Sequence, residues 1–214
     1  MTRIKVCGIT RREDAQAAAA LGADAIGVIF AAESPRCVTP EQAAEALRDL
    51  PPFVSSVGVF VNEAAGRVVS VARQCGLTAV QLHGEEQPSI VDELPGLRVL
   101  RALRVRDRSS LSEMRAWRVA AFVLDAYVPG ARGGTGLPVS VELAREAVES
   151  GARVVLAGGL TPDNVRDAVA AVRPYAVDVS SGVEEKPGIK DRRKMEDFVA
   201  AVREADAAAE GRTR

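Results

Sequence analysis

Two residues in this sequence, Cys7 and Asp125, have side chains and surroundings suited to proton transfer. Cys7 ends the short apolar stretch that begins at Ile4, and Asp125 ends an apolar stretch that begins at Ala121. A thiolate can accept a proton, and a carboxyl group among apolar neighbours can keep its proton until a substrate takes it. Lys5 lies on the same face of an extended chain as Cys7, and its positive charge would favour the thiolate. The pair suits an isomerisation by proton transfer, which requires neither a metal nor a cofactor.

Each of these residues also has a simpler structural explanation. An unpaired cysteine is often buried as a small hydrophobic residue, so Cys7 by itself leaves both interpretations open. Asp125 could instead cap the loop that follows it or pair with Arg132, and Lys5 could be paired at the floor of the fold. The choice depends on which other residues the fold brings beside them.

Glycine- and serine-rich turns late in the chain predict a phosphate site. Gly158 and Gly159 follow one apolar stretch, and Ser180, Ser181 and Gly182 follow the next. Glycine lets backbone N–H groups approach an anion closely, and the first turn of a helix adds a partial positive charge. The alternative is that these glycines only form tight turns. Agreement between two adjacent turns favours phosphate binding.

Four further residues at the ends of apolar stretches are candidates for binding the substrate. Arg36, in a Ser-Pro-Arg segment, could hold a carboxylate through two parallel hydrogen bonds, although it could equally be an ordinary surface arginine. Gln81 and His83 end a third apolar stretch, and His83 could hydrogen-bond a substrate or only stabilise its loop. Asp178 lies next to the second of the predicted phosphate turns.

The candidates fall at the ends of apolar stretches because the whole chain alternates between short β-branched segments and longer helical ones. The segments expected to be strands are 4–7, 25–30, 56–60, 79–82, 99–103, 121–124, 154–157 and 176–179. The segments expected to be helices are 11–21, 40–50, 64–75, 88–94, 110–117, 141–149, 162–172 and 191–205. These pairs, with strands apolar on both faces, predict an α/β fold: a single (β/α)8 TIM barrel over residues 1–205, followed by a polar tail over 206–214. In that fold the carboxyl ends of the strands form one rim, where the candidates would meet.

Local signals predict where several of these helices begin. Thr39 precedes a proline and is followed by Gln42 at the spacing of a capping box. Thr161 also precedes a proline, as a residue that caps a helix often does. Thr10 and Glu13 have the same three-residue spacing and predict the start of the first helix.

The composition and charge exclude several classes of protein. The chain has 214 residues, 47% of them hydrophobic and 27% charged, with a net charge of −1 and no clustered run of Lys and Arg. Nucleic acid is therefore not an expected partner, and no stretch is long and apolar enough to span a membrane. The three cysteines form neither a CxxC pair nor a disulfide framework, which favours a reducing cytoplasm, and the single histidine cannot form a multi-histidine metal site. The expected partner is a small phosphorylated substrate, and the protein is expected to be a monomer or a homodimer.

Seven motifs occur in order between Arg3 and about Val202: KVCGIT, GADAIGVIF followed by SPR, VGVFVN, VQLHG, VLDAYVPGARGGTG, LAGGLTPDNV and DVSSGVEEKPGIKD. Together they resemble the motifs of the phosphoribosylanthranilate isomerase family of tryptophan biosynthesis. The resemblance implies a (β/α)8 barrel that converts N-(5-phosphoribosyl)anthranilate to 1-(2-carboxyphenylamino)-1-deoxy-D-ribulose 5-phosphate. The implied reaction is an Amadori rearrangement with general acid–base catalysis and no metal or cofactor.

The resemblance also implies a role for individual residues. Cys7 matches the family's general base and Asp125 its general acid, while Arg36 matches the arginine that holds the anthranilate carboxylate. The last two loops of the barrel are implied to hold the phosphate. Asp125 would protonate the furanose ring oxygen, and Cys7 would remove the proton from C2′ of the opened sugar.

One departure from the family pattern leaves two other functions open. After GGTG the family usually has a segment like Thr-Phe-Asp-Trp, whereas this chain has Leu137 to Val141, so an aromatic cover over the substrate is expected to be missing. A dual-substrate sugar isomerase of histidine and tryptophan synthesis would need a second phosphate site and a paired aspartate. The end of the first predicted strand, where that aspartate would be needed, has Cys7 instead. A non-catalytic barrel that binds a phosphorylated metabolite is favoured by the altered segment but not by the presence of both Cys7 and Asp125.

Overall fold

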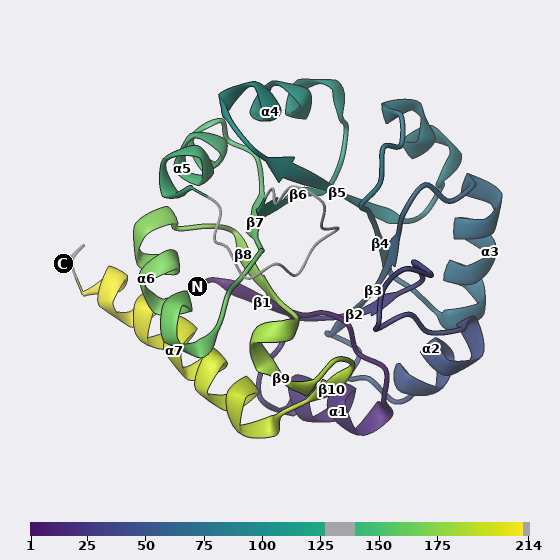
Figure 1. Ribbon diagram of the computed structural model, residues 1–214, viewed down its shortest axis with the longest axis horizontal. Coiled ribbons are helices and arrows are strands. Elements are labelled where there is room, and N and C mark those ends of the chain that lie inside the picture. The colour runs from purple at the N-terminus through teal and green to yellow at the C-terminus, as the bar shows by residue number, and fades with distance from the viewer. Residues whose placement is uncertain (127–139, 212–214) are drawn as a thin grey trace.

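Eight parallel strands close into a barrel, and helices cover its outside (Figure 1). The computed structural model describes residues 1–126 and 140–211. Each strand pairs with the next one in the chain, and the last closes on the first. The strands are β1 (Arg3–Val6), β2 (Ala25–Ile29), β3 (Ser55–Phe60), β4 (Ala79–Leu82), β5 (Arg98–Val105), β6 (Ala121–Ala126), β7 (Val154–Leu156) and β8 (Ala176–Val179). The predicted (β/α)8 TIM barrel is confirmed.

Helices follow the strands and pack against the outward-facing side chains of the barrel. The α-helices are α1 (Arg12–Ala20), α2 (Pro40–Ala46), α3 (Ala65–Cys75), α4 (Arg108–Ser112), α5 (Val141–Glu149), α6 (Pro162–Val172) and α7 (Arg192–Glu210). The 3₁₀ helices are η1 (Pro88–Glu93), η2 (Glu113–Ala116) and η3 (Ser181–Val183). An antiparallel hairpin of β9 (Glu184–Lys186) and β10 (Ile189–Lys190) lies between β8 and α7.

The two predicted starts at threonine–proline pairs are confirmed. The Thr39 hydroxyl accepts a hydrogen bond from the Gln42 N–H, and the Gln42 side chain accepts one from the Thr39 N–H, so a capping box begins α2. At the start of α6 the Asn164 side chain accepts a hydrogen bond of 2.8 Å from the Thr161 N–H. Both helices begin with the proline that follows the threonine, where its missing N–H has no helical partner to lose.

The predicted capping box of Thr10 and Glu13 is wrong. Helix α1 begins one residue later than predicted, at Arg12, and no side chain caps its first turn. The Thr10 hydroxyl instead donates a hydrogen bond of 2.6 Å to the carbonyl oxygen of Gly188 in the β9–β10 hairpin. A contact with a distant segment has therefore taken the hydroxyl that the local pattern assigned to the helix.

The cover over β4 and β5 is more irregular than predicted. Residues 88–94 and 110–117 were expected to be helices, but the first forms the 3₁₀ helix η1 and the second only the short α4 followed by η2. No residue of η1 is buried. A regular α-helix in a barrel is stabilised mainly by the apolar face it buries, and these segments offer little such face.

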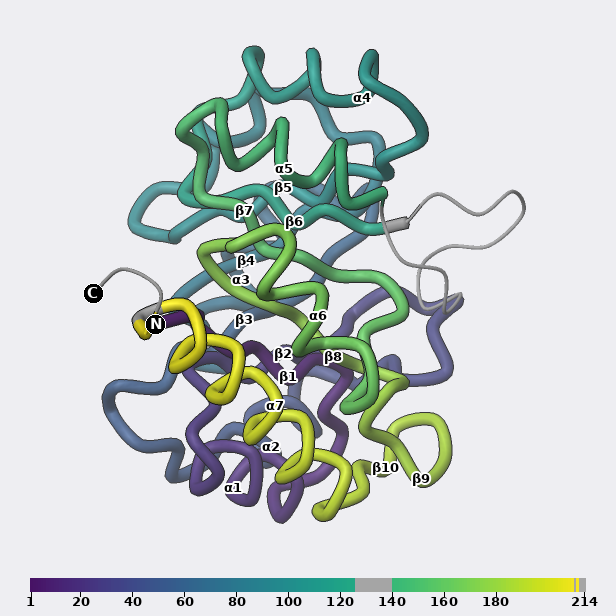
Figure 2. The backbone as a smooth tube through the Cα atoms, turned by 90° about the vertical axis from the view of Figure 1, so that its left-hand side faces the viewer, coloured from purple at the N-terminus to yellow at the C-terminus, as the bar shows by residue number. Residues whose placement is uncertain are grey.

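The carboxyl-terminal part of the last helix holds the amino terminus of the chain. Helix α7 runs to Glu210, past its expected end at Ala205, and comes to lie beside the start of β1 (Figure 2). There the Asp206 carboxylate accepts hydrogen bonds from the Thr2 N–H at 2.9 Å and from the Thr2 hydroxyl at 2.7 Å. Residues 206–210, expected in the polar tail, are therefore helical and hold the amino terminus in place.

Polar side chains on three of the strands are buried beside a cluster of small apolar residues. Small apolar residues of β5 to β8, together with Ala157 directly after β7, form this inner cluster: Ala102, Ala121, Val123, Val155, Ala157 and Ala176. Lys5, Gln81 and Asp178, on β1, β4 and β8, are buried at exposures of 4%, 2% and 9%. Burial of such groups is unfavourable without partners, so their contacts show what the interior is built to do.

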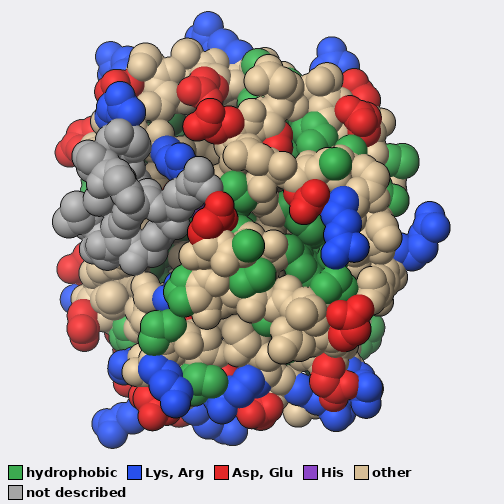
Figure 3. Space-filling model, turned by 45° about the vertical axis from the view of Figure 1, so that its right-hand side comes forward, with side chains coloured by type: hydrophobic (Ala, Val, Ile, Leu, Met, Phe, Trp, Pro, Cys, Tyr) green, Lys and Arg blue, Asp and Glu red, His purple; other side chains and the backbone are tan. Residues whose placement is uncertain are grey.

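The outer surface carries charges of both signs. On the face shown in Figure 3, Lys and Arg side chains lie among Asp and Glu side chains and do not form one basic patch. Among the described residues, none of the helices has the length and apolar character needed to cross a membrane.

Candidate active site

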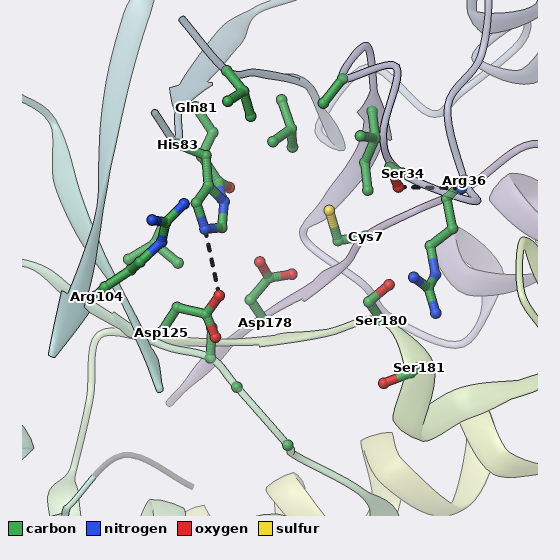
Figure 4. Close-up of a pocket in the computed structure, with 18 of the residues that line it drawn as sticks. Cys7, Ser34, Arg36, Gln81, His83, Arg104, Asp125, Asp178, Ser180 and Ser181 are labelled. Carbon is green, nitrogen blue, oxygen red and sulfur yellow. Dashed lines mark hydrogen bonds and ion pairs between the residues drawn. The ribbon is translucent and has the colours of Figure 1, made fainter. Parts of the chain in front are cut away.

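Most of the predicted residues meet in one cavity at the carboxyl ends of the strands (Figure 4). The cavity has a volume of about 310 Å³. The predicted residues that line it are Cys7, Arg36, Gln81, His83, Asp125, Gly158, Gly159, Asp178, Ser180 and Ser181. Gly182 is not among them: a Cβ atom there would lie 1.9 Å from the carbonyl oxygen of Leu160, so its role is to let the turns after β7 and β8 touch.

Cys7 is buried directly after β1, and its sulfur points into the cavity (Figure 4). Its N–H donates a hydrogen bond of 2.8 Å to the carbonyl oxygen of Val179, which fixes the backbone at this strand end. On β2, a Cβ atom at Gly27 would lie 2.8 Å from the sulfur, so the glycine leaves room for the thiol. The alternative that Cys7 is only a packing residue does not account for a sulfur that faces the cavity.

A buried ion pair lies beneath the thiol. The Lys5 Nζ donates a hydrogen bond of 2.7 Å to Oδ2 of Asp178, and both side chains are buried. Burial lowers the pKa of Lys5, but the Asp178 carboxylate and Cys7 outweigh this effect and leave its pKa above the ordinary value, so Lys5 is charged. Both explanations for Lys5 therefore hold together: it is paired at the floor of the cavity, and it acts on Cys7.

Lys5 lowers the pKa of the Cys7 thiol, as expected, but burial raises this pKa by more. Burial raises the pKa of the Cys7 thiol, and Lys5 opposes this by its charge and a hydrogen bond. The nearby Asp178 carboxylate also raises the pKa, which as a result stays above the ordinary thiol value. The unliganded site thus holds a neutral thiol beside a cation that stabilises the thiolate once it forms.

Asp125 and His83 form a second polar pair on the other side of the cavity (Figure 4). His83 Nε2 lies 3.4 Å from Asp125 Oδ2, and His83 Nδ1 lies 3.2 Å from the Gln81 side-chain nitrogen. An amide nitrogen can only donate, so Nδ1 accepts and the imidazole proton is on Nε2, facing Asp125. His83 therefore supports Asp125 rather than only its own loop. Arg132, the alternative partner of Asp125, lies outside the described residues, as do residues 137–139 of the altered segment.

Arg36 contacts a carboxylate within the protein. Its Nε donates to Glu184 Oε1 at 2.8 Å, and its Nη2 donates to Glu184 Oε2 at 2.7 Å. Arg36 nevertheless lines the cavity, and its Nη1 is not used in this pairing. Glu184 therefore occupies the Nε–Nη2 edge of the arginine that was predicted to bind a substrate carboxylate.

Three buried polar atoms of residues that line the cavity have no hydrogen-bond partner within the described part of the chain. They are Gln81 Oε1, Asp178 Oδ1 and Ser180 Oγ. Buried polar atoms are almost always paired, because an unpaired one retains an uncompensated desolvation penalty of about 1–3 kcal/mol. Unpaired donors and acceptors on several sides of one cavity are suited to a ligand with several hydroxyl groups and an anionic group.

The turns after β7 and β8 have the geometry expected for an anion site. Gly158 and Gly159 have φ angles of +79° and +68°, a region that favours glycine. The Asn164 side chain donates a hydrogen bond of 2.9 Å to the Gly159 carbonyl oxygen, which ties this turn to the first turn of α6. Ser180 and Ser181 line the same cavity (Figure 4).

Sequence reasoning missed Arg104, Glu184 and Lys190. Arg104 lines the cavity and pairs in register with Asp125, but the predicted strand ended at Leu103 while β5 runs to Val105. Period-two alternation from Ala102 would have identified it as an inward-facing residue. Glu184 and Lys190 gave no such signal, because they lie in a hairpin outside the strand–helix alternation.

The chain matches known proteins over almost its whole length. The family model described as N-(5'phosphoribosyl)anthranilate (PRA) isomerase matches residues 4–201. The N-(5'-phosphoribosyl)anthranilate isomerase of Trichlorobacter lovleyi is 51% identical over 205 residues, which cover 96% of this chain and 100% of that one.

Solved structures agree with this match. Monomers derived from the dimeric phosphoribosylanthranilate isomerase of Thermotoga maritima superpose with a TM-score of 0.86 at 36% identity, covering 95% of this chain and 100% of that one. A phosphoribosyl anthranilate isomerase in complex with reduced 1-(o-carboxyphenylamino)-1-deoxyribulose 5-phosphate superposes with a TM-score of 0.84 at 38% identity, with the same coverage of 95% and 100%.

Proposed function

Because the chain belongs to the N-(5′-phosphoribosyl)anthranilate isomerase family, it is an isomerase of tryptophan biosynthesis, and we propose how its residues carry out the reaction. The substrate is N-(5′-phosphoribosyl)anthranilate and the product is 1-(2-carboxyphenylamino)-1-deoxy-D-ribulose 5-phosphate. The observation that carries the assignment of roles is the placement of a thiol and a carboxyl group on different sides of one cavity.

The first step opens the sugar ring. Asp125 donates its proton to the furanose ring oxygen, and the C1′–O bond breaks as the anthranilate nitrogen forms a protonated Schiff base with C1′. Since the substrate nitrogen forms the imine itself, no lysine Schiff base is required. The proton of His83 Nε2 faces the carboxylate that remains and stabilises it.

The second step moves a proton away from C2′. The Cys7 thiolate removes it, and the electrons of the C–H bond flow to the iminium nitrogen, which gives a neutral enolamine. Protonation at C1′ and loss of the proton of the C2′ hydroxyl group then convert the enolamine to the neutral aminoketone. Lys5 stabilises the thiolate in this step, because the positive charge lies next to the sulfur in a buried site.

The substrate is held by groups at its ends. Gly158, Gly159, Ser180 and Ser181 provide the phosphate site, and Arg36 binds the anthranilate carboxylate. Between them the unpaired oxygens of Gln81 and Asp178 accept hydrogen bonds from sugar hydroxyls. Gly182 supports the phosphate turns without lining the cavity. Fixing the substrate in this way allows two weak acid–base groups to act efficiently.

Complementation tests the proposed function most directly. The gene for this chain is expected to restore growth without tryptophan to a bacterial strain that lacks phosphoribosylanthranilate isomerase. A parallel strain that lacks the corresponding isomerase of histidine synthesis is expected not to grow, because Cys7 occupies the position where a dual-substrate enzyme would need an aspartate. Failure in the first strain, with soluble folded protein present, would rule out the assigned activity and favour the non-catalytic barrel.

We also propose that the protein acts in the cytoplasm as a homodimer. The cysteines Cys7, Cys37 and Cys75 are all unpaired, as in a reducing compartment. Met1 and Phe53 are exposed at 90% and 97% and precede β1 and β3, so both lie at the amino-terminal end of the barrel, away from the cavity. A homodimer would cover them. A light-scattering mass equal to that of one chain would overturn this part of the proposal.

A further inference from the structure

A buried cluster of three charged side chains lies beside the cavity. The Glu184 carboxylate accepts two hydrogen bonds from Arg36, as described above, and a third of 2.9 Å from the Lys190 Nζ to Oε1. The side chains of Glu184 and Lys190 are exposed at 4% and 0%. A carboxylate at this depth is stable only when cations pair with it, and here two cations do so.

The charges of the cluster leave it with a net positive character. Burial raises the pKa of Glu184, but Arg36 and Lys190 together outweigh this and hold it below the ordinary value, so Glu184 is ionised. Burial lowers the pKa of Lys190, and the hydrogen bond and charge of Glu184 oppose this. With Lys190 protonated, two cations and one anion carry one excess positive charge. The cluster can therefore stabilise Arg36 in one orientation and still attract a second carboxylate.

The pairing fixes which edge of Arg36 is available. Glu184 binds the edge formed by Nε and Nη2, so Nη1 and the second hydrogen of Nη2 remain for a ligand in the cavity. An arginine fork held in this way loses less freedom when it binds a second carboxylate than an unrestrained side chain would.

The same cluster reaches the turn that carries Ser180. The Lys190 Nζ donates a second hydrogen bond, of 3.1 Å, to the Ser180 carbonyl oxygen. At Gly8, which has a φ of +73°, a Cβ atom would lie 2.5 Å from Arg36 Cδ and 2.8 Å from Ser180 Oγ. Arg36 and Ser180 therefore pack against the same glycine, one residue after Cys7.

The hairpin that supplies the cluster is itself fixed. The Gly188 N–H at its tip donates to Glu184 Oε1 at 3.2 Å, and the Lys190 N–H donates to Asp14 Oδ2 at 3.1 Å. The Lys194 Nζ donates to the Glu184 carbonyl oxygen at 2.8 Å, which ties the hairpin to α7. This network restrains the position of the Glu184 carboxylate.

We propose that Glu184, held by Lys190, is a positioning residue that orients Arg36 toward the carboxylate of the substrate and links it to the turn that carries Ser180. The inference rests on the proposed function, because it assigns Arg36 to the anthranilate carboxylate. Glu184 itself touches no reacting atom and acts only through Arg36.

The test is Glu184→Gln, which keeps the size of the side chain and removes its charge. KM for phosphoribosylanthranilate is expected to rise about 10- to 100-fold, the loss typical of one charge-assisted hydrogen bond, with kcat nearly unchanged. Glu184→Asp keeps the charge and is expected to recover part of the loss. The matched control is Glu185→Gln, an exposed neighbour, which is expected to behave as the wild type.

Ligand binding distinguishes a positioning role from a structural one. The probes are reduced 1-(o-carboxyphenylamino)-1-deoxyribulose 5-phosphate and the same compound without its carboxyl group. Glu184→Gln is expected to weaken the first by about 10- to 100-fold and to leave the second unchanged. In the double variant with Arg36→Met, the loss is expected to be no greater than in Arg36→Met alone, because both changes remove one interaction.

Several outcomes would overturn the proposal. Equal weakening of both ligands, a fall in kcat without a change in KM, or additive losses in the double variant would each show that Glu184 does not act through Arg36. A wild-type enzyme with no turnover would reject the proposed function instead, and the two failures are distinguishable because ligand binding is measured without turnover. If Glu184→Gln lowers the unfolding temperature strongly, the two ligands are compared in Glu184→Asp instead, where the shorter side chain is expected to weaken only the first ligand, by a smaller factor.

Discussion

Replacing Asp125 by asparagine is expected to lower kcat about 10²- to 10⁴-fold while KM changes little. The amide has nearly the same shape as the carboxyl group, so substrate contacts and packing are kept, but it does not donate the acidic proton that opens the sugar ring. His83 Nε2, 3.4 Å from Asp125 Oδ2, can still donate to the amide oxygen. The measurement is steady-state kinetics with phosphoribosylanthranilate, with Asp167→Asn as a control for loss of an exposed carboxylate.

An isotope effect separates the ring-opening role from a general loss of activity. With substrate deuterated at C2′, slow ring opening in Asp125→Asn should hide the isotope effect of the later C2′ deprotonation. In Cys7→Ser the same deprotonation becomes the slow step, and the full isotope effect should appear. If Asp125→Asn showed the larger isotope effect, the roles of the two residues would have to be exchanged.

The barrel could be predicted from the sequence because its signals are local. Alternation of short apolar and helical segments fixes the strand order, since each parallel strand in this fold pairs with the next. Cys7, Asp125 and the turns at Gly158 and Ser180 could be predicted for the same reason: each stands at the end of a strand, and the fold brings all strand ends to one rim.

What could not be predicted depends on contacts between distant segments. Arg36 and Glu184 are 148 residues apart, and no period or spacing in the sequence relates them. Thr10 met the requirement for a helix cap, but its hydroxyl contacts Gly188 instead. Gly182 was predicted to bind phosphate because it belongs to the second of two adjacent glycine- and serine-rich turns, whereas the approach of Leu160 explains why it is glycine. These side-chain partners are determined by which distant segments become neighbours when the barrel closes.

The pKa of Cys7 is where charge and burial oppose each other, and it leads to a second prediction. Replacing Cys7 by serine is expected to lower kcat about 10²- to 10⁴-fold, because a hydroxyl is much less acidic than a thiol and supplies almost no anion at neutral pH. In the wild type, kcat/KM is expected to rise with pH as the thiolate forms. Since burial holds the pKa of the thiol above its ordinary value, about 8.5, this rise should lie on the alkaline side of that pH.

The two members of the ion pair beneath the sulfur act on the pKa of Cys7 in opposite directions. Lys5 lowers the pKa of Cys7, so Lys5→Met should move the rise in kcat/KM to higher pH, whereas Lys5→Arg should keep it in place. Asp178 raises the same pKa, so Asp178→Asn should move the rise to lower pH. The free-enzyme profile of kcat/KM measures both shifts, with exposed Lys186→Met as the control. Opposite shifts in the pH at which kcat/KM rises would show that the buried pair sets the basicity of the thiol. Shifts of the same sign in both variants, or a rise in kcat/KM that persists in Cys7→Ser, would mean that another group removes the C2′ proton.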